Sequence, residues 1–348
     1  MARQARMKVK GQGMYYHVMN RLAGPKEGHW PLTDVDKEKG FELIQSACRY
    51  FLIEPIAMTF MGNHFHLVVY VPSEAEMPSD QAVGERYNAF YAGKKCGKFG
   101  IGNTDEPERL AKVKAEMVDL SLFMKWFSQV YTRYYNRANK LRGRLWADRF
   151  KSVLLDRNGA LWNCVKYVEL NPVRANLTED AADYRFCSWG RYKGSGVHPF
   201  AANFEKHLGG MGERFTVGAA SEANASLSPV PALRASQEQL YLAFEAEMVR
   251  TVLTEKTAAT AANEAAIESE VKAVRAGQRK ESMPLRFLRR TRHWTDGAII
   301  GSKAFVQETA CLFREKESVL RHKLSRGMDA SAGSGSAVYC FRRLREMS

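Results

Sequence analysis

The sequence predicts a mixed α+β fold, and three observations predict it. Short apolar runs rich in β-branched and aromatic residues indicate strands at 14–21, 53–60 and 64–71. Between the first two, apolar side chains recur at helical spacing and predict a helix that ends near Phe51. Finally, 45% of the 348 residues are hydrophobic and 26% are charged, which is typical of a globular protein with a sizeable core.

Each remaining element has a local signal. Thr33 and Asp36 have the spacing of a capping box and predict where the first helix begins. The turn at 61–63 contains Gly62-Asn63 and joins the second and third strands as a hairpin. Helical spacing or strand character predicts a short helix at 81–92, a long helix at 118–139, a strand at 149–155 and a helix from Asp156 to about Leu170. Asn171-Pro172 ends that helix, and 173–176 is expected to be a loop.

The charge balance indicates a polyanionic partner. Lys and Arg number 52 against 38 Asp and Glu, which gives a net charge of +14 and a pI near 9.5. A nucleic acid is a more natural partner for such a surface than a membrane, although a generic basic surface is the alternative. The six cysteines form no C-x-x-C pair, so neither a zinc ribbon nor a disulfide framework is expected. No apolar run has the length of a membrane helix, and a cytoplasmic location is expected.

His64 and His66 are the first candidate site residues. They lie two apart at the start of the third strand, so their side chains point to the same face, with Phe65 on the other. Two neutral imidazoles on one face suit a divalent metal ion that keeps open positions for a substrate. The alternative is a pair of half-buried polar residues without a ligand.

A basic segment interleaved with aromatic residues follows the long helix. Its cations alternate with Trp146 and Phe150, a composition that suits stacking of single-stranded bases and pairing with phosphates. A solvated strand edge with inward aromatic residues explains the pattern equally well. The candidate DNA-binding cations here are Arg142, Arg144, Arg149 and Lys151.

Tyr167 and Asn171 form the second candidate pair. They lie four apart, so on a helix they share one face. The phenol is a potential nucleophile, and the amide oxygen is a potential ligand for a hard cation. Tyr131, Tyr134 and Tyr135 compete for the role of nucleophile because they too lie on a predicted helix.

The composition changes after residue 205. A connector is expected over 206–270, with a linker at its start and a helical part from Glu238. From residue 271 to the end, 17 Lys and Arg face 7 Asp and Glu. Arginines at 289, 290 and 292 precede Trp294, and two short helices, one before Gly301 and one over 303–314, would form a helix-turn-helix. A pair of basic docking helices is the alternative. The candidate DNA-binding cations of this region are Arg289, Arg290 and Arg292.

Taken together, these motifs resemble a known family. His64-Phe65-His66 resembles the HUH motif, and Tyr167 with Asn171-Pro172-Val173-Arg174 resembles the tyrosine helix and N-P-V-R segment of REP-associated tyrosine transposases. These are relatives of the single-strand transposases of insertion sequences. The similarity runs in the family's order from about Gly13 to Tyr192, and it includes the segments 16–21, 143–151 and 188–192.

The resemblance implies a ferredoxin-like catalytic domain over 1–205, whose central antiparallel sheet carries the HUH motif, followed by a mainly α-helical extension. It implies an enzyme dependent on Mg²⁺ or Mn²⁺ that cuts and rejoins single-stranded DNA near hairpins in palindromic elements. Tyr167 would form a 5′-phosphotyrosine, and His64, His66 and Asn171 would hold the metal, with Arg174 among the DNA contacts. Insertion-sequence members often carry Gln at the position of Asn171.

Two other functions are compatible with the same residues. The first is a non-catalytic regulator that binds DNA or RNA hairpins and retains the fold. The second is a replication initiator with the same chemistry, but no helicase-like phosphate loop is present to favour its larger members. In a bacterial cell the expected place of action is the nucleoid. Relatives act as monomers or as homodimers, and the sequence does not decide between them.

Overall fold

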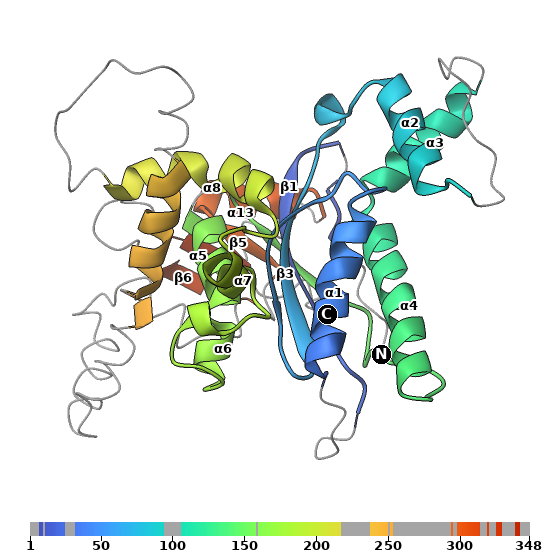
Figure 1. Ribbon diagram of the computed structural model, residues 1–348. Coiled ribbons are helices and arrows are strands. Elements are labelled where there is room, and N and C mark those ends of the chain that lie inside the picture. Colours follow the sequence, from blue (N-terminus) through green and yellow to red (C-terminus); the bar gives the residue numbers. More distant parts are fainter. Residues whose placement is uncertain are drawn as a thin grey trace, which may run out of the picture. The chain divides into compact units, whose positions relative to one another are not determined.

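The computed structural model divides the chain into two compact units, which are described separately (Figure 1). The first comprises Met1–Ser152 and Asn171–Pro199, and the second comprises Val153–Leu170 and Phe200–Ser348. The residues that the structure describes are 7–9, 11–24, 32–93, 106–157, 159–216, 237–249, 251–252, 294, 298–313, 319, 325–328 and 338–341.

Three antiparallel strands form the centre of the first unit. They are β1 (Met14–Arg21), β2 (Glu54–Phe60) and β3 (His64–Val71), in the order β2-β3-β1. The register pairs Met19 with His66 and Arg21 with His64. Nearly every residue of the three strands is buried. The sequence predicted all three strands within one residue of these bounds, and the hairpin is confirmed.

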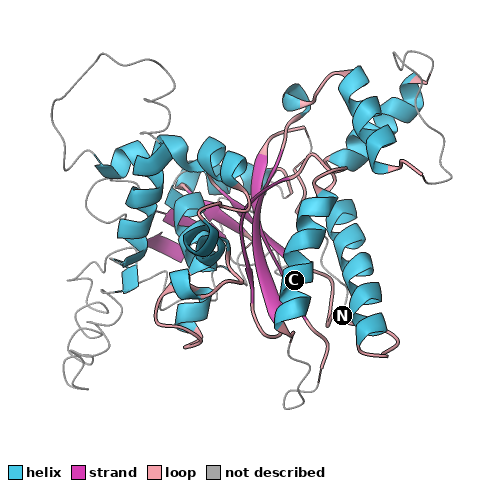
Figure 2. Cartoon of the chain, in the orientation of Figure 1, coloured by secondary structure: helices cyan, strands magenta, loops and turns pink. Residues whose placement is uncertain are grey.

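Helices α1 (Asp34–Ala47) and α4 (Leu120–Ala138) lie side by side along one face of this sheet (Figures 1 and 2). The Thr33–Asp36 capping box begins α1 as predicted. Gly40 is required where α1 meets the sheet, because a Cβ atom there would lie 2.2 Å from the ring of Phe60. The helix ends at Ala47, four residues before the predicted end, because the chain turns at 48–50 to reach β2.

Two shorter helices follow β3, and only one was predicted. A single 3₁₀ turn, η1 (Glu74–Glu76), leads to α2 (Asp80–Phe90), which matches the predicted helix. The second, α3 (Pro107–Met117), was missed, although its apolar residues Leu110, Val113 and Met117 follow helical spacing. Pro107 stands in its first turn, where proline is favoured.

The last part of the first unit covers the edge of β2. It contains α6 (Asn171–Arg174), η2 (Ala181–Asp183) and α7 (Ser188–Ser195). The backbone N–H of Phe60 donates to the carbonyl oxygen of Phe186 at 2.8 Å, and the Tyr184 hydroxyl donates to the carbonyl oxygen of Phe60 at 2.7 Å. An exposed strand edge is a site for unwanted pairing, and this segment occupies it.

The second unit is built around the helix α5 (Gly159–Glu169). It contains the inner end of β4 (Lys151–Leu155), parallel to β5 (Ile299–Gly301), and antiparallel pairs of β5 with β7 (Val338–Phe341) and of β7 with β6 (Ser325–Met328). The helices α8 (Ala201–Thr216) and α13 (Lys303–Cys311) also belong to it, as does a helical segment at 237–249.

Three predicted features differ in the structure. Residues 173 and 174, predicted as the start of a loop, belong to α6, because Pro172 ends one helix and is tolerated in the first turn of the next. Residues 299–301 form a strand and not the end of a helix, because β4 and β7 pair with it on its two sides. The C-terminal region was predicted to be mainly helical, and most of its described residues are helical, but it also contributes three short strands that were not predicted.

Some predictions fall on residues that the structure does not describe. These are Arg289, Arg290, Arg292 and the linker at 218–236. Among the described residues, no helix has both the length and the apolar character needed to cross a membrane. The five described cysteines are free thiols.

Candidate functional site

The strand β3 presents its two histidines on one face, as predicted. Phe65 points to the other face, where its ring centroid lies 5.4 Å from that of Phe127 on α4 and 5.5 Å from that of Trp146. The rings of His64 and His66 lie 5.1 Å apart, edge to face. His66 is buried and His64 is half-buried at the end of the strand.

Each histidine has a polar partner at its Nδ1 atom. The Nδ1 of His66 lies 2.9 Å from the Nε2 of His17 on the neighbouring strand β1. The Nδ1 of His64 lies 2.7 Å from the side-chain oxygen of Asn63 in the hairpin turn. The sequence analysis predicted no role in the site for His17 or Asn63. The period of two along β1 places His17 and Met19 on one face, but only the register with β3 shows that this is the face of His66.

Burial keeps both histidines neutral. The pKa of His64 is lowered to about 4, chiefly by burial and also by the charge of Arg21. The pKa of His66 is lowered well below its usual value, first by burial and then by His17, His64 and Arg174. Both imidazoles therefore carry no charge at neutral pH, which is the form that binds metals.

The short helix α6 brings a cation to this face. The positive charge of Arg174 contributes to the lowered pKa of His66, so α6 lies near the histidines within the first unit. Asn171 precedes Arg174 by three residues on α6, and side chains three apart on a helix are neighbours. Asn171 is half-buried. Its role as a metal ligand stays a prediction.

His64, His66 and Asn171 carry donor atoms of the kinds that bind divalent cations. Among the described residues, no group of three or more His, Cys, Asp or Glu side chains is arranged to hold a metal ion. Two neutral imidazoles and an amide oxygen would therefore leave the remaining positions to water or a phosphate oxygen. Oxygen ligands suit Mg²⁺ and Mn²⁺, and imidazole favours metals later in the transition series, so Mn²⁺ fits this set better than Mg²⁺.

Tyr167 lies in the second unit, on α5. It is 5% exposed, and its ring stacks on that of Trp294 with 5.7 Å between the centroids. Helix α5 ends at Glu169, and a turn at Leu170 separates it from α6 and Asn171. The sequence predicted that Tyr167 and Asn171 share one helix. In the structure they lie on two successive helices. The role of Tyr167 as nucleophile stays a prediction.

The competing tyrosines on α4 are parts of the core or its border. Tyr131 is fully buried, and its hydroxyl donates to the backbone oxygen of Asp36 at 3.0 Å. Burial raises the pKa of Tyr131, Tyr134 and Tyr135, which makes each a poorer nucleophile at neutral pH.

The basic segment after α4 separates its cations from its aromatic rings. Trp146 and Phe150 are 6% and 7% exposed, so they face the core and do not form a stacking platform. Pairing of this segment with the end of β1 turns the two rings inward, which was the alternative explanation of the pattern. The predicted cations Arg142, Arg144, Arg149 and Lys151 are all exposed.

The same pairing places the basic segment at the histidine end of the sheet. The backbone N–H of Ala147 donates to the carbonyl oxygen of Arg21 at 2.9 Å, and Leu22 bridges to Trp146. Arg21 is the register partner of His64. Exposed cations therefore flank the strand end at which His64 lies, a suitable arrangement for a phosphate backbone.

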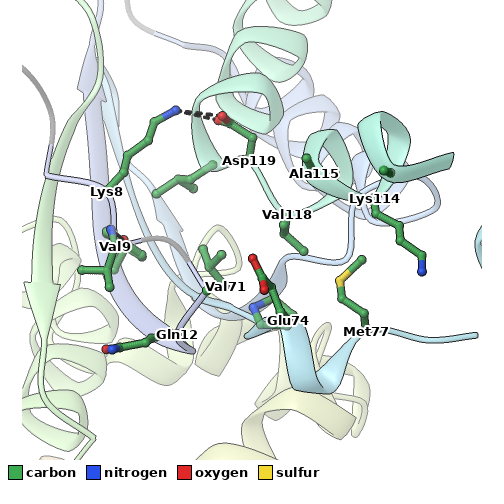
Figure 3. A pocket seen from close by; sticks show the side chains of 15 residues that line it. Lys8, Val9, Gln12, Val71, Glu74, Met77, Lys114, Ala115, Val118 and Asp119 are labelled. Carbon is green, nitrogen blue, oxygen red and sulfur yellow. Dashed lines mark hydrogen bonds and ion pairs between the residues drawn. The ribbon is translucent and has the colours of Figure 1, made fainter. Parts of the chain in front are cut away.

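A separate cavity lies at the opposite end of β3 (Figure 3). It has a volume of about 520 Å³ and is lined mainly by apolar side chains, with Val71 at the end of the strand. The ammonium of Lys8 is 2.9 Å from the Asp119 carboxylate at its edge. None of the residues predicted for the metal or for DNA lines this cavity.

Comparisons with known proteins give one likeness. No protein-family model matches the chain, and no curated protein matches it either. One similar solved structure is described as "Structure of the REP associates tyrosine transposase bound to a REP hairpin". It is 17% identical, covers 57% of this chain and 90% of that chain, and has a TM-score of 0.34.

Proposed function

We propose that the protein cuts and rejoins single-stranded DNA near hairpins, as a transposase of the tyrosine type. The observation that carries the proposal is the pair of neutral imidazoles of His64 and His66, side by side on one sheet face with exposed cations at the same strand end. We further infer that the first unit is a ferredoxin-like domain whose HUH motif is His64-Phe65-His66. Its place of action would be the bacterial nucleoid.

In this proposal His64, His66 and Asn171 hold Mg²⁺ or Mn²⁺. The bound cation would act as a Lewis acid that stabilises negative charge on a phosphodiester. Exposed Arg142, Arg144, Arg149 and Lys151 would bind the DNA backbone without reading its sequence. Arg174 would face a phosphate oxygen from α6. The partner is thus single-stranded DNA with a hairpin or palindrome.

The covalent step belongs to Tyr167. Its phenolic oxygen attacks phosphorus, a new bond forms between that oxygen and phosphorus, and the bond from phosphorus to the 3′ oxygen breaks. The phenol proton leaves to solvent, and the departing 3′ oxygen takes up a proton. The product is a 5′-phosphotyrosine and a free 3′ hydroxyl. A second 3′ hydroxyl then attacks the same phosphorus, releases the tyrosine and joins the strands without ATP.

The test is covalent capture of a labelled DNA hairpin in the presence of Mn²⁺. Wild-type protein should give an adduct that survives denaturing electrophoresis, and Tyr167→Phe should give none while it binds the hairpin within a few-fold of wild type. Tyr134→Phe on α4 is the matched control and should retain the adduct. An adduct formed by Tyr167→Phe would refute the assignment of the nucleophile.

The outcome also separates this proposal from a purely binding role. The exposed basic residues by themselves are equally suited to a regulator that binds DNA or RNA hairpins without cleaving them. Salt-sensitive hairpin binding by the wild type, with no adduct in Mn²⁺ or Mg²⁺ on any palindromic substrate, would favour that regulator. Gel filtration of the protein with its hairpin would distinguish a monomer from a homodimer.

A further inference from the structure

Two side chains outside the proposed ligand set contact the Nδ1 atoms of His64 and His66. The Nε2 atom of His17 lies 2.9 Å from the Nδ1 atom of His66. The side-chain oxygen of Asn63 lies 2.7 Å from the Nδ1 atom of His64. A neutral imidazole has one N–H group and one nitrogen with a lone pair. The state of Nδ1 therefore decides whether Nε2 is available to a cation.

The contact of Asn63 fixes the tautomer of His64. The partner atom is the amide oxygen, which only accepts hydrogen bonds. The Nδ1 of His64 must then carry the hydrogen, and its Nε2 keeps the lone pair. Asn63 lies in the turn directly before β3, so the hairpin itself supplies this partner.

The contact of His17 with His66 has two possible proton positions. If His66 donates from Nδ1, its Nε2 has a lone pair and is able to bind a metal. If His17 donates from Nε2, the Nε2 of His66 carries a hydrogen and cannot bind one. His17 thus controls the ligand even though it is not itself in the proposed metal shell.

We propose that His17 is a positioning residue that accepts the Nδ1 hydrogen of His66 and so holds His66 ready to bind a divalent cation through Nε2. Asn63 has the same function towards His64. This inference rests on the proposed metal site and adds the residues that orient it. Partners of this kind orient metal-binding histidines and raise their basicity in many metal sites.

The packing of His17 supports a fixed geometry. His17 is 0% exposed, and its ring is nearly parallel to that of His66, with 5.1 Å between centroids and 19° between planes, as expected for two rings joined edge to edge by a hydrogen bond. Both side chains are buried and come from paired strands. Rotation of His66 away from its partner would break a buried hydrogen bond, which is costly.

The test measures Mn²⁺ affinity by the electron paramagnetic resonance signal of free Mn²⁺, with the full chain. His17→Leu removes the acceptor and should weaken affinity by about 10-fold to 100-fold. His17→Gln places an amide oxygen near the position of Nε2 and should restore affinity to within a few-fold of wild type. Met19→Leu, opposite His66 on β1, removes no hydrogen bond and should leave affinity unchanged.

A second measurement uses only the wild-type protein, so it does not depend on whether the variants fold. Proton–nitrogen correlation spectra of the Mg²⁺-loaded wild type should show His66 with its hydrogen on Nδ1, and the opposite tautomer would overturn the inference. Wild-type affinity in His17→Leu, together with lost affinity in His66→Ala, would overturn the role of His17 and leave the metal site standing. Absence of Mn²⁺ binding by the wild type would overturn both.

Discussion

The buried ion pair between Lys166 on α5 and Glu247 gives the sharpest test of how the second unit is stabilised. The ammonium of Lys166 on α5 lies 3.4 Å from the carboxylate of Glu247, and the two side chains are 6% and 7% exposed. At an effective dielectric constant of about 20, their attraction is roughly 5 kcal/mol, which is offset by the cost of removing both charges from water. The pair as a whole therefore adds little net stability.

Breaking the pair has a different cost. Lys166→Met removes the ammonium that pairs with the buried carboxylate of Glu247, and we expect a loss of about 3–5 kcal/mol in the free energy of unfolding. That is a large part of the total stability of a typical domain, which is about 5–15 kcal/mol. Lys166→Met combined with Glu247→Leu should recover most of this loss, because the double variant removes both charges of the pair.

The assay is urea unfolding, together with hydrogen exchange of peptides that cover α5. The single variant should unfold at lower urea concentration and lose protection in α5, and the double variant should regain both. Unfolding of Lys166→Met at the wild-type urea concentration would refute the reasoning, because the two charges would then be solvated. Equal losses in the single and double variants would instead attribute the effect to packing alone.

Two further predictions concern the first unit. Gly190→Ala should lower stability by about 1–3 kcal/mol, because its Cβ would lie 2.1 Å from the carbonyl oxygen of Tyr184. Gly194→Ala, on the same helix with no atom within 4 Å, should be neutral or raise stability by up to about 1 kcal/mol in thermal unfolding, and equal effects would contradict this contrast. Burial opposes ionisation of Asp119, but the hydrogen bonds from Lys8 and two backbone N–H groups outweigh it and lower its pKa. The stability from Asp119 is therefore present above its unfolded pKa, near 3.8, and is lost as the pH falls through the lower folded pKa. Asp119→Asn keeps a helix cap, so its melting temperature should approach that of wild type at low pH, and a constant difference across the pH range would contradict the assignment.

Local patterns predicted the parts of the site that local physics determines. The alternation along 64–71 placed both histidines on one face and Phe65 in the core, because successive side chains on a strand point to opposite faces. The Gly62-Asn63 turn predicted the hairpin, and the Thr33–Asp36 box predicted the start of α1. Each signal lies within a few residues of the feature that it predicts.

Features that depend on tertiary contacts were missed or misjudged. His17 is separated from His66 by 49 residues, and only the pairing of β1 with β3 brings them together. Trp146 faces inward because its segment pairs with the end of β1, a contact that composition does not encode. The strand β5 has only three residues, and its pairing with β4 and β7 overrode the helical expectation.

The structure also changes how the C-terminal region is understood. Every residue of α5 from Ala160 to Glu169 is buried, so this helix needs packing partners on all sides. Several of those partners come from beyond residue 205. They are Phe244, whose ring lies 5.2 Å from that of Trp162, then Glu247, which pairs with Lys166, and Trp294, which stacks on Tyr167.

These contacts make the C-terminal region part of the environment of the proposed nucleophile. On an isolated α5, the side chains of Trp162 and Lys166 would be exposed to water. In this structure both are buried, and residues from 237–249 contact them. The predicted connector is therefore, over those residues, a structural support for α5. Because Trp294 stacks on the ring of Tyr167, any movement of this phenol towards DNA must begin by separating the two rings. If Tyr167 is the nucleophile, the C-terminal region would influence its reactivity through the packing of α5.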